Sequence, residues 1–283
     1  MTGLDDLNPD HIRELLLATA GDRADPRFFV EPRLHPAVEL QRRYDAADYE
    51  AKARLKTALT EAVAEWRARA HGADNLRFLA QAAAAIRARS TAPHFERILR
   101  LHRLLSGPAD AALADAVGDV LATLAGFAPG DEIGELLERL FLSPGLLPGL
   151  AGVLFQGLCR SRPAELPRWL GRYVEVVDGS GVRHFSQPVF LRLFVESVTP
   201  PALVNAWPDL DSALRRFLLE DLGRLRRDES PDLFFALESG GATLHVRAGD
   251  REETFELRSR SVGQRYDDMR NSYDLIDLPP AVN

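Results

Sequence analysis

The sequence predicts an all-α protein: a right-handed stack of helix pairs, followed by a small β-hairpin and an extended tail. Short amphipathic segments alternate with Gly/Pro breaks through the middle of the chain. Taking every second break as a start gives Asp74, Pro108, Pro148 and Ser186, which are separated by 34, 40 and 38 residues. Two-helix repeats have lengths of this order. After Gly240 the apolar period shortens to two, which is typical of strands.

The composition narrows the class of protein. With 283 residues, 46% of them hydrophobic, the chain can bury one or two domain cores. Lys52 and Lys56 are the only lysines among 35 basic residues, so the other 33 are arginines, a bias typical of a GC-rich bacterial genome. The net charge of −7 argues against a dedicated nucleic-acid coat. The single cysteine, Cys159, excludes an internal disulfide and a cysteine-rich zinc module.

Two features bear on the compartment. The N-terminal residues have neither the basic nor the apolar region of a signal peptide, so we expect a cytoplasmic protein. Residues 140–159 are uncharged over about the length of a membrane span, but Pro144 and Pro148 interrupt them. The helix that remains after Pro148 is too short to cross a bilayer, so we expect a buried helix and no membrane partner.

Residues 1–72 are predicted to form an N-terminal helical subdomain or cap. Asn8 and Pro9 give a capping residue followed by a first-turn proline, and an apolar stripe follows them. Residues 36–69 have a helical apolar period and form one long helix or two. Terminal repeats usually depart from the rest of an array, which fits a cap here.

Residues 73–240 are predicted to form the helical-repeat domain. Apolar residues recur at helical spacing in each segment, prolines stand at many first turns, and glycines end several segments. In this pattern the chain resembles the HEAT/armadillo class of α-solenoids. The resemblance rests on helix length and spacing and indicates no specific family. A compact helical bundle gives much the same pattern and remains the alternative.

The C-terminal part is predicted to form two further segments, a β-hairpin over residues 241–260 and an extended tail over residues 261–283. Leu244 and Val246 alternate with polar residues, as do Phe255 and Leu257 after a Gly-Asp turn. Because an isolated hairpin is marginal in water, these four side chains should pack on the last helices or on a partner.

Candidate reactive groups are few, and each has a structural interpretation that we prefer. Cys159 lacks an assignable His or Asn partner, and His94 and His102 are too far apart to bind one metal ion as an i, i+4 pair. Asp115 and Asp119 lie one turn apart and predict a solvated helix face. The other two candidates are a glycine-rich turn and an acidic pair in the tail: Gly179-Ser180-Gly181 and Asp267-Asp268. We therefore expect no metal and no cofactor.

The charge distribution gives the candidate binding residues. Residues 51–100 carry ten basic and four acidic residues, whereas residues 101–150 carry two basic and seven acidic ones. The candidate partner-binding residues are five arginines and two tail tyrosines: Arg87, Arg89, Arg97, Arg100, Arg103, Tyr266 and Tyr273. Arginines on a shared face would suit an acidic protein first and nucleic acid second.

The function predicted from the sequence is that of a non-catalytic interaction adaptor or accessory subunit of a bacterial complex. The repeat pattern and the lack of a catalytic motif favour it. Two alternatives stay open. One is a nucleic-acid-binding protein resembling the HEAT-like DNA glycosylases, and the other is an all-α enzyme with an unrecognised site.

Overall fold

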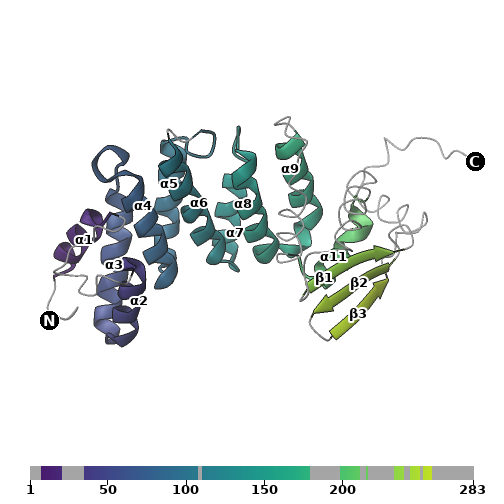
Figure 1. Cartoon of the computed structure of the whole chain (residues 1–283), viewed down its shortest axis with the longest axis horizontal. Helices are drawn as coiled ribbons and strands as arrows, with labels where there is room; N and C mark the ends of the chain where they lie inside the picture. The colour runs from purple at the N-terminus through teal and green to yellow at the C-terminus, as the bar shows by residue number, and fades with distance from the viewer. Residues whose placement is uncertain are drawn as a thin grey trace, which may run out of the picture. The chain divides into compact units, whose positions relative to one another are not determined.

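The structure is a computed structural model of the whole chain, and it is predominantly helical (Figure 1). It describes residues 8–20, 35–107, 110–178, 198–210, 215, 233–238, 243–248 and 251–256. The chain divides into two compact units. The first comprises residues 1–163 and 169–185, and the second comprises residues 164–168 and 186–283.

The first unit contains most of the described helices. They are α1 (Pro9–Ala18), α2 (Pro36–Ala46), α3 (Tyr49–Glu65), α4 (Ala68–Ala85), α5 (Ala92–Leu101), α6 (Ala111–Gly126), α7 (Asp131–Phe141), α8 (Pro148–Ser161) and most of α9 (Leu166–Asp178). Short 3₁₀ turns precede α5 and α9, at Arg89–Thr91 and Pro163–Glu165. The segment 36–69 was predicted to form one long helix or two. In the structure it forms α2 and α3, which Ala47 and Asp48 separate, and α4 begins before the segment ends.

Local sequence signals explain where these helices begin. The side chain of Asn8 accepts a hydrogen bond from the backbone N–H of Asp10, and that of Asp48 accepts one from Ala51. Asp110 caps α6 in the same way through the N–H of Leu113. Each cap satisfies a backbone donor that has no partner inside its helix. Helix α8 instead begins at a proline, whose fixed φ suits the first turn.

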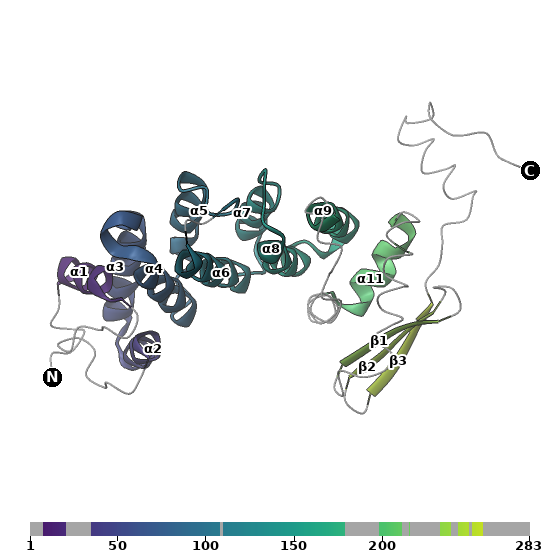
Figure 2. The same ribbon diagram turned by 45° about the horizontal axis from the view of Figure 1, so that its top comes forward.

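The helices of the first unit pack in two rows. Helices α2, α4, α6 and α8 contact one another in that order, and α1, α3, α5 and α7 do the same. Figure 2 shows α5 and α7 on one side of the neighbouring α6 and α8. A helix therefore packs against the next but one in the chain within its row, and the buried residues lie between the rows.

Close packing between the rows depends on Gly157 of α8. A Cβ at this position would lie 2.7 Å from Cδ1 of Leu137 in α7 and 3.0 Å from the Cβ of Ala125 in α6. Both of these residues are buried. Aromatic contacts attach α9 to the same core, because Trp169 packs on Phe141 with ring centroids 6.4 Å apart.

Polar contacts also join helices that are far apart in the chain. The amide nitrogen of the fully buried Asn75 in α4 donates to the carbonyl oxygens of Leu16 and Thr19 at the end of α1. Gly72, with φ of +74°, breaks α4 just before this residue. A left-handed φ is readily adopted by glycine, so the break separates the entry turn from the part of α4 that packs.

The second unit contains α11 (Pro200–Ala206), a 3₁₀ turn at Trp207–Asp209 and three strands. The strands are β1 (Leu233–Glu238), β2 (Thr243–Ala248) and β3 (Arg251–Glu256), and they pair antiparallel in the order β1-β2-β3. Leu244 pairs with Phe255 across β2 and β3.

Two predictions for the second unit have different outcomes. The sequence pattern predicted a helical-repeat domain that extends to residue 240, but the structure has strand β1 at Leu233–Glu238. The apolar run LFFAL fits a strand as well as a helix, since short apolar runs do not distinguish the two. The predicted packing of the hairpin side chains stays a prediction, and the tail lies outside the described residues.

Candidate interaction surface

Helix α5 presents a basic and partly apolar face away from the core. Its buried residues Phe95, Ile98 and Leu99 follow helical spacing, so they pack inward. The opposite face carries Arg97, Arg100 and Leu101, all of which are exposed. The outward direction of these side chains follows from the helical period alone.

Glu96 fixes α5 to α7 through an ion pair with Arg139. The Nε and Nη2 atoms of Arg139 donate to the two carboxylate oxygens of Glu96 at 2.9 and 2.8 Å. Arg100 adds a longer contact of 3.4 Å to the same carboxylate. The hydrogen bonds from Arg139 are the main reason that the pKa of Glu96 is lowered, although burial opposes them. Glu96 is therefore an anion held between two cations.

Two leucines are exposed at the neighbouring ends of α5 and α7. Leu101 is 66% exposed and Leu142, which follows the last residue of α7, is 43% exposed. The Glu96–Arg139 pair joins the middle of α5 to the last turn of α7, and the backbone N–H of Leu147 donates to the carbonyl of Leu105 in the loops beyond. We call this region the Leu101 surface, and it is formed by four arginines and two leucines: Arg97, Arg100, Leu101, Arg103, Arg139 and Leu142.

The structure brings together only some of the predicted binding residues. Arg97, Arg100 and Arg103 lie along and just beyond α5, whereas Arg87 and Arg89 precede it. The helix has 10 residues, which corresponds to about 15 Å between its ends. Arg89 instead approaches the carbonyl oxygen of Pro129, at 3.5 Å.

The remaining predicted binding residues are two tyrosines of the tail. Tyr266 and Tyr273 lie outside the described residues. The arginines thus fall into two groups, one at each end of α5, and the Leu101 surface contains one of these groups.

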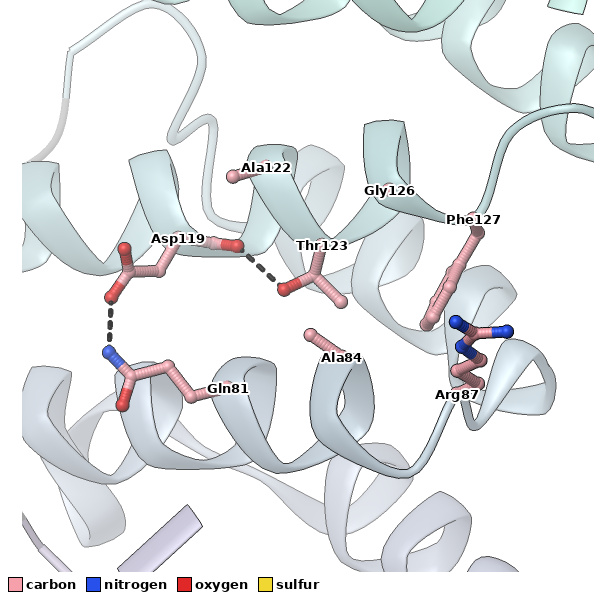
Figure 3. Close-up of a pocket in the computed structure, with 8 residues that line it drawn as sticks. All are labelled: Gln81, Ala84, Arg87, Asp119, Ala122, Thr123, Gly126 and Phe127. Atoms are coloured by element: carbon pink, nitrogen blue, oxygen red, sulfur yellow. Dashed lines mark hydrogen bonds between the residues drawn. The ribbon is translucent and has the colours of Figure 1, made fainter. Parts of the chain in front are cut away.

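A shallow groove lies between α4 and α6, with a volume of about 310 Å³ (Figure 3). Gln81 and Asp119 form one part of its wall, where the amide nitrogen of Gln81 donates to the carboxylate at 3.0 Å. Arg87 and Phe127 lie together at the other end. Four small residues form the rest: Ala84, Ala122, Thr123 and Gly126.

The chemistry of this groove favours structure over catalysis. Arg77 of α4 also donates to the Asp119 carboxylate, at 3.0 Å, so this group links α6 to α4. The predicted solvated helix face therefore fits Asp115, whose side chain is 68% exposed. It fits Asp119 less well, because Asp119 pairs with Arg77. The carboxylate of Asp119 is an ion-pair partner, and the neighbouring Thr123 hydroxyl donates to the backbone carbonyl oxygens of Ala80 and Asp119.

The other candidate reactive groups have structural surroundings. Burial raises the pKa of the Cys159 thiol, which disfavours the thiolate that a nucleophile needs. His102 is exposed and packs edge-on against Trp66, with ring centroids 5.7 Å apart. Within the described residues no three His, Cys, Asp or Glu side chains gather closely enough to hold a metal ion. The Gly179-Ser180-Gly181 and Asp267-Asp268 motifs lie outside those residues.

Sequence reasoning missed three residues of the Leu101 surface. Leu101 departs from the apolar stripe of α5, and this departure was the available signal that it points outward. Arg139 and Leu142 had no comparable signal, because Arg139 reaches a carboxylate 43 residues earlier in the chain. Only packing of α7 beside α5 brings them together.

The comparisons with known proteins give no family for this chain. No family model matches it, and neither a curated protein nor a solved structure was found to be similar to it. In the described part of the chain, no helix has both the length and the apolar character that a bilayer-spanning segment requires.

Proposed function

We propose that this protein is a non-catalytic interaction adaptor or accessory subunit of a bacterial complex, with its first unit built as an α-solenoid. The observation that carries the proposal is the two-row order of helix packing, in which each helix contacts the next but one along the chain. Arrays of this kind leave one face of every helix free, which makes an extended binding surface.

The exposed groups support a binding role over a catalytic one. The outward face of α5 offers arginines, which are enriched in protein interfaces, and an exposed leucine. The groove between α4 and α6 offers an ion-paired carboxylate, and the buried Cys159 has a raised pKa. An all-α enzyme would need a reactive group poised in a pocket, and the described residues offer no such arrangement.

The nucleic-acid alternative has weaker support. A duplex needs a positive surface that extends along several phosphates. Asp131, Glu132 and Glu135 are exposed on α7. These carboxylates would repel the phosphate backbone of a duplex that runs along α7, whereas a short segment of a protein can bind at one end of the helices, so a protein partner is the better candidate.

The solenoid is tested by small-angle scattering on a fragment of residues 1–185. A compact domain of that length has a radius of gyration of about 16 Å. The proposal expects a clearly larger value, because helices stacked in rows extend in one direction. A value of about 16 Å would favour the compact bundle instead.

The adaptor role is tested by purifying the tagged protein from its native host after nuclease treatment. We expect one protein to co-purify in a fixed ratio and to reassociate when both purified components are mixed. Co-purification of nucleic acid in place of a protein, or turnover of a small molecule by the purified chain, would overturn the role.

A further inference from the structure

We propose that the Leu101 surface is the docking site for an acidic amphipathic helix of a protein partner. This inference rests on the proposed adaptor function and adds the position of the site and the chemistry of its occupant. Charge complementarity selects the occupant, and the two exposed leucines define where its apolar residues bind.

The charge argument begins with the cations of the surface. Arg97, Arg100, Arg103 and Arg139 contribute four positive charges, and Glu96 contributes one negative charge. The neighbouring Glu135 and Glu138 of α7 form ion pairs with Arg162 and also act electrostatically on Arg139, so the balance with these three groups included is an excess of two positive charges (5 − 3).

Two of these arginines, Arg97 and Arg103, do not stabilise the fold through an ion pair in the described residues. Within the described residues no carboxylate pairs with the side chain of Arg97 or Arg103. Arg100 and Arg139 stay substantially exposed although they pair with Glu96, at 62% and 49% of their side chains. Guanidinium groups bind carboxylates through paired hydrogen bonds, so all four can accept an acidic partner.

The apolar argument concerns Leu101 and Leu142. A leucine that is 66% exposed on a helix whose other large apolar residues are buried contributes little to folding. Leu101 is the last residue of α5 and Leu142 follows the last residue of α7, and a backbone hydrogen bond from Leu147 to Leu105 joins the loops beyond the two helices. An apolar stripe on a partner helix covers both leucines, while acidic residues beside that stripe reach the arginines.

The exposed acidic residues of α7 determine at which end of the helices the partner binds. Asp131 and Glu132 form the first turn of α7, at the helix end opposite to Leu142. They repel an acidic helix there and so restrict it to the C-terminal ends of α5 and α7.

The test measures binding of a fluorescein-labelled helical peptide by fluorescence anisotropy. The peptide has Leu at positions i, i+3, i+4 and i+7 and Glu elsewhere. Two further probes separate the contributions: a scrambled peptide of the same composition, and a version with Lys in place of Glu. The full chain should bind the first peptide and bind the other two at least about tenfold more weakly.

Matched variants locate the site. Arg97→Glu with Arg103→Glu should weaken binding at least about tenfold, whereas Arg87→Glu with Arg89→Glu, which makes the same change in net charge, should leave it within about threefold. Leu101→Ser should weaken binding, and Val38→Ser, an equally apolar change on exposed α2, should not. All six positions are exposed arginines or apolar residues, and circular dichroism checks that each of the four variants keeps its fold.

Three results would overturn the inference. Equal binding of the scrambled peptide would mean that charge alone attracts the probe. An equal loss in both arginine pairs would mean that net charge acts without a site. Tighter binding of a random duplex DNA than of the acidic peptide, with loss in the Arg97/Arg103 variant, would assign the surface to nucleic acid.

The result also separates this inference from the adaptor role. If the native partner still co-purifies with the Arg97→Glu/Arg103→Glu variant, the adaptor role stands and the docking site is wrong. If no partner co-purifies with either protein, the adaptor role fails on its own test.

Discussion

At the scale of single residues, two helical glycines, Gly157 and Gly118, contribute differently to the fold. Gly157 allows α8 to approach α6 and α7, because a Cβ there would lie 2.7 Å from Leu137. Gly118, in the middle of α6, has no described neighbour within 4 Å of such a Cβ. Packing requires a glycine at position 157, whereas Gly118 only lowers the stability of its helix through the conformational entropy that glycine loses on folding.

We predict that Gly157→Ala destabilises the protein by about 1–3 kcal/mol, since the added methyl group overpacks the core. Gly118→Ala is the matched control and should stabilise by about 0.5–1 kcal/mol through helix propensity. Chemical denaturation of both variants measures the difference. A neutral Gly157→Ala would show that α8 does not approach its neighbours as closely as described.

Asn75 is the residue whose hydrogen bonds hold α1 on α4. We predict that Asn75→Ala costs about 1–3 kcal/mol, because the carbonyls of Leu16 and Thr19 lose a buried donor. Asn75→Asp keeps the shape but replaces the donor with an acceptor, so it should cost at least as much. Hydrogen exchange should show faster exchange confined to α1, and a wild-type exchange pattern in Asn75→Asp would contradict this role.

At the scale of elements, the contact between α5 and α7 depends on Glu96. Its side chain is mostly buried, at 12% exposure, and Arg139 binds both of its oxygens. The pKa of Glu96 is lowered in the folded state. Its contribution to stability is therefore fully present above the ordinary value of 4.5 and is lost as the pH falls through the lower folded-state pKa.

We predict that Glu96→Gln destabilises by about 1–2 kcal/mol at neutral pH, because charge-assisted hydrogen bonds become neutral ones and Arg139 is half exposed. The difference from the wild type should shrink as the pH falls below 4.5. Glu175→Gln, which removes an exposed partner of Arg172, should change stability by less than about 0.5 kcal/mol. Urea denaturation across this pH range tests both, and a difference that stays constant down to acid pH would contradict the ion pair.

At the scale of the whole molecule, stability in the first unit should depend on contacts between neighbouring helices. Each helix buries its apolar stripe against the next members of the two rows, so removing a terminal helix exposes the stripe of its neighbour. Leu137 illustrates this dependence, since it is fully buried and contacts α8 at Gly157.

We predict that a fragment of residues 1–185 keeps the helical content of the first unit and stays monomeric. A fragment that ends at Ser143 lacks α8 and α9, so it should be less stable and scatter light in a concentration-dependent way. Circular dichroism and light scattering compare the two fragments. Equal stability and equal scattering would show that the core does not continue from α7 into α8.

The sequence by itself determined where most helices of the first unit begin. Expected starts at Asn8-Pro9 and Pro148 agree with the structure, because a helix start depends on capping and on φ within a few residues. The predominantly helical fold was also predictable, since the apolar period is a local property.

Tertiary structure decided which distant residues meet. The sequence grouped Arg87 with Arg103, but α5 separates them by about its own length. It did not reveal Arg139 beside Glu96, nor strand β1 where a helix had been expected, because strand pairing and inter-helix ion pairs join residues far apart in the chain. Local rules fix the elements, and only packing fixes the surface that they present.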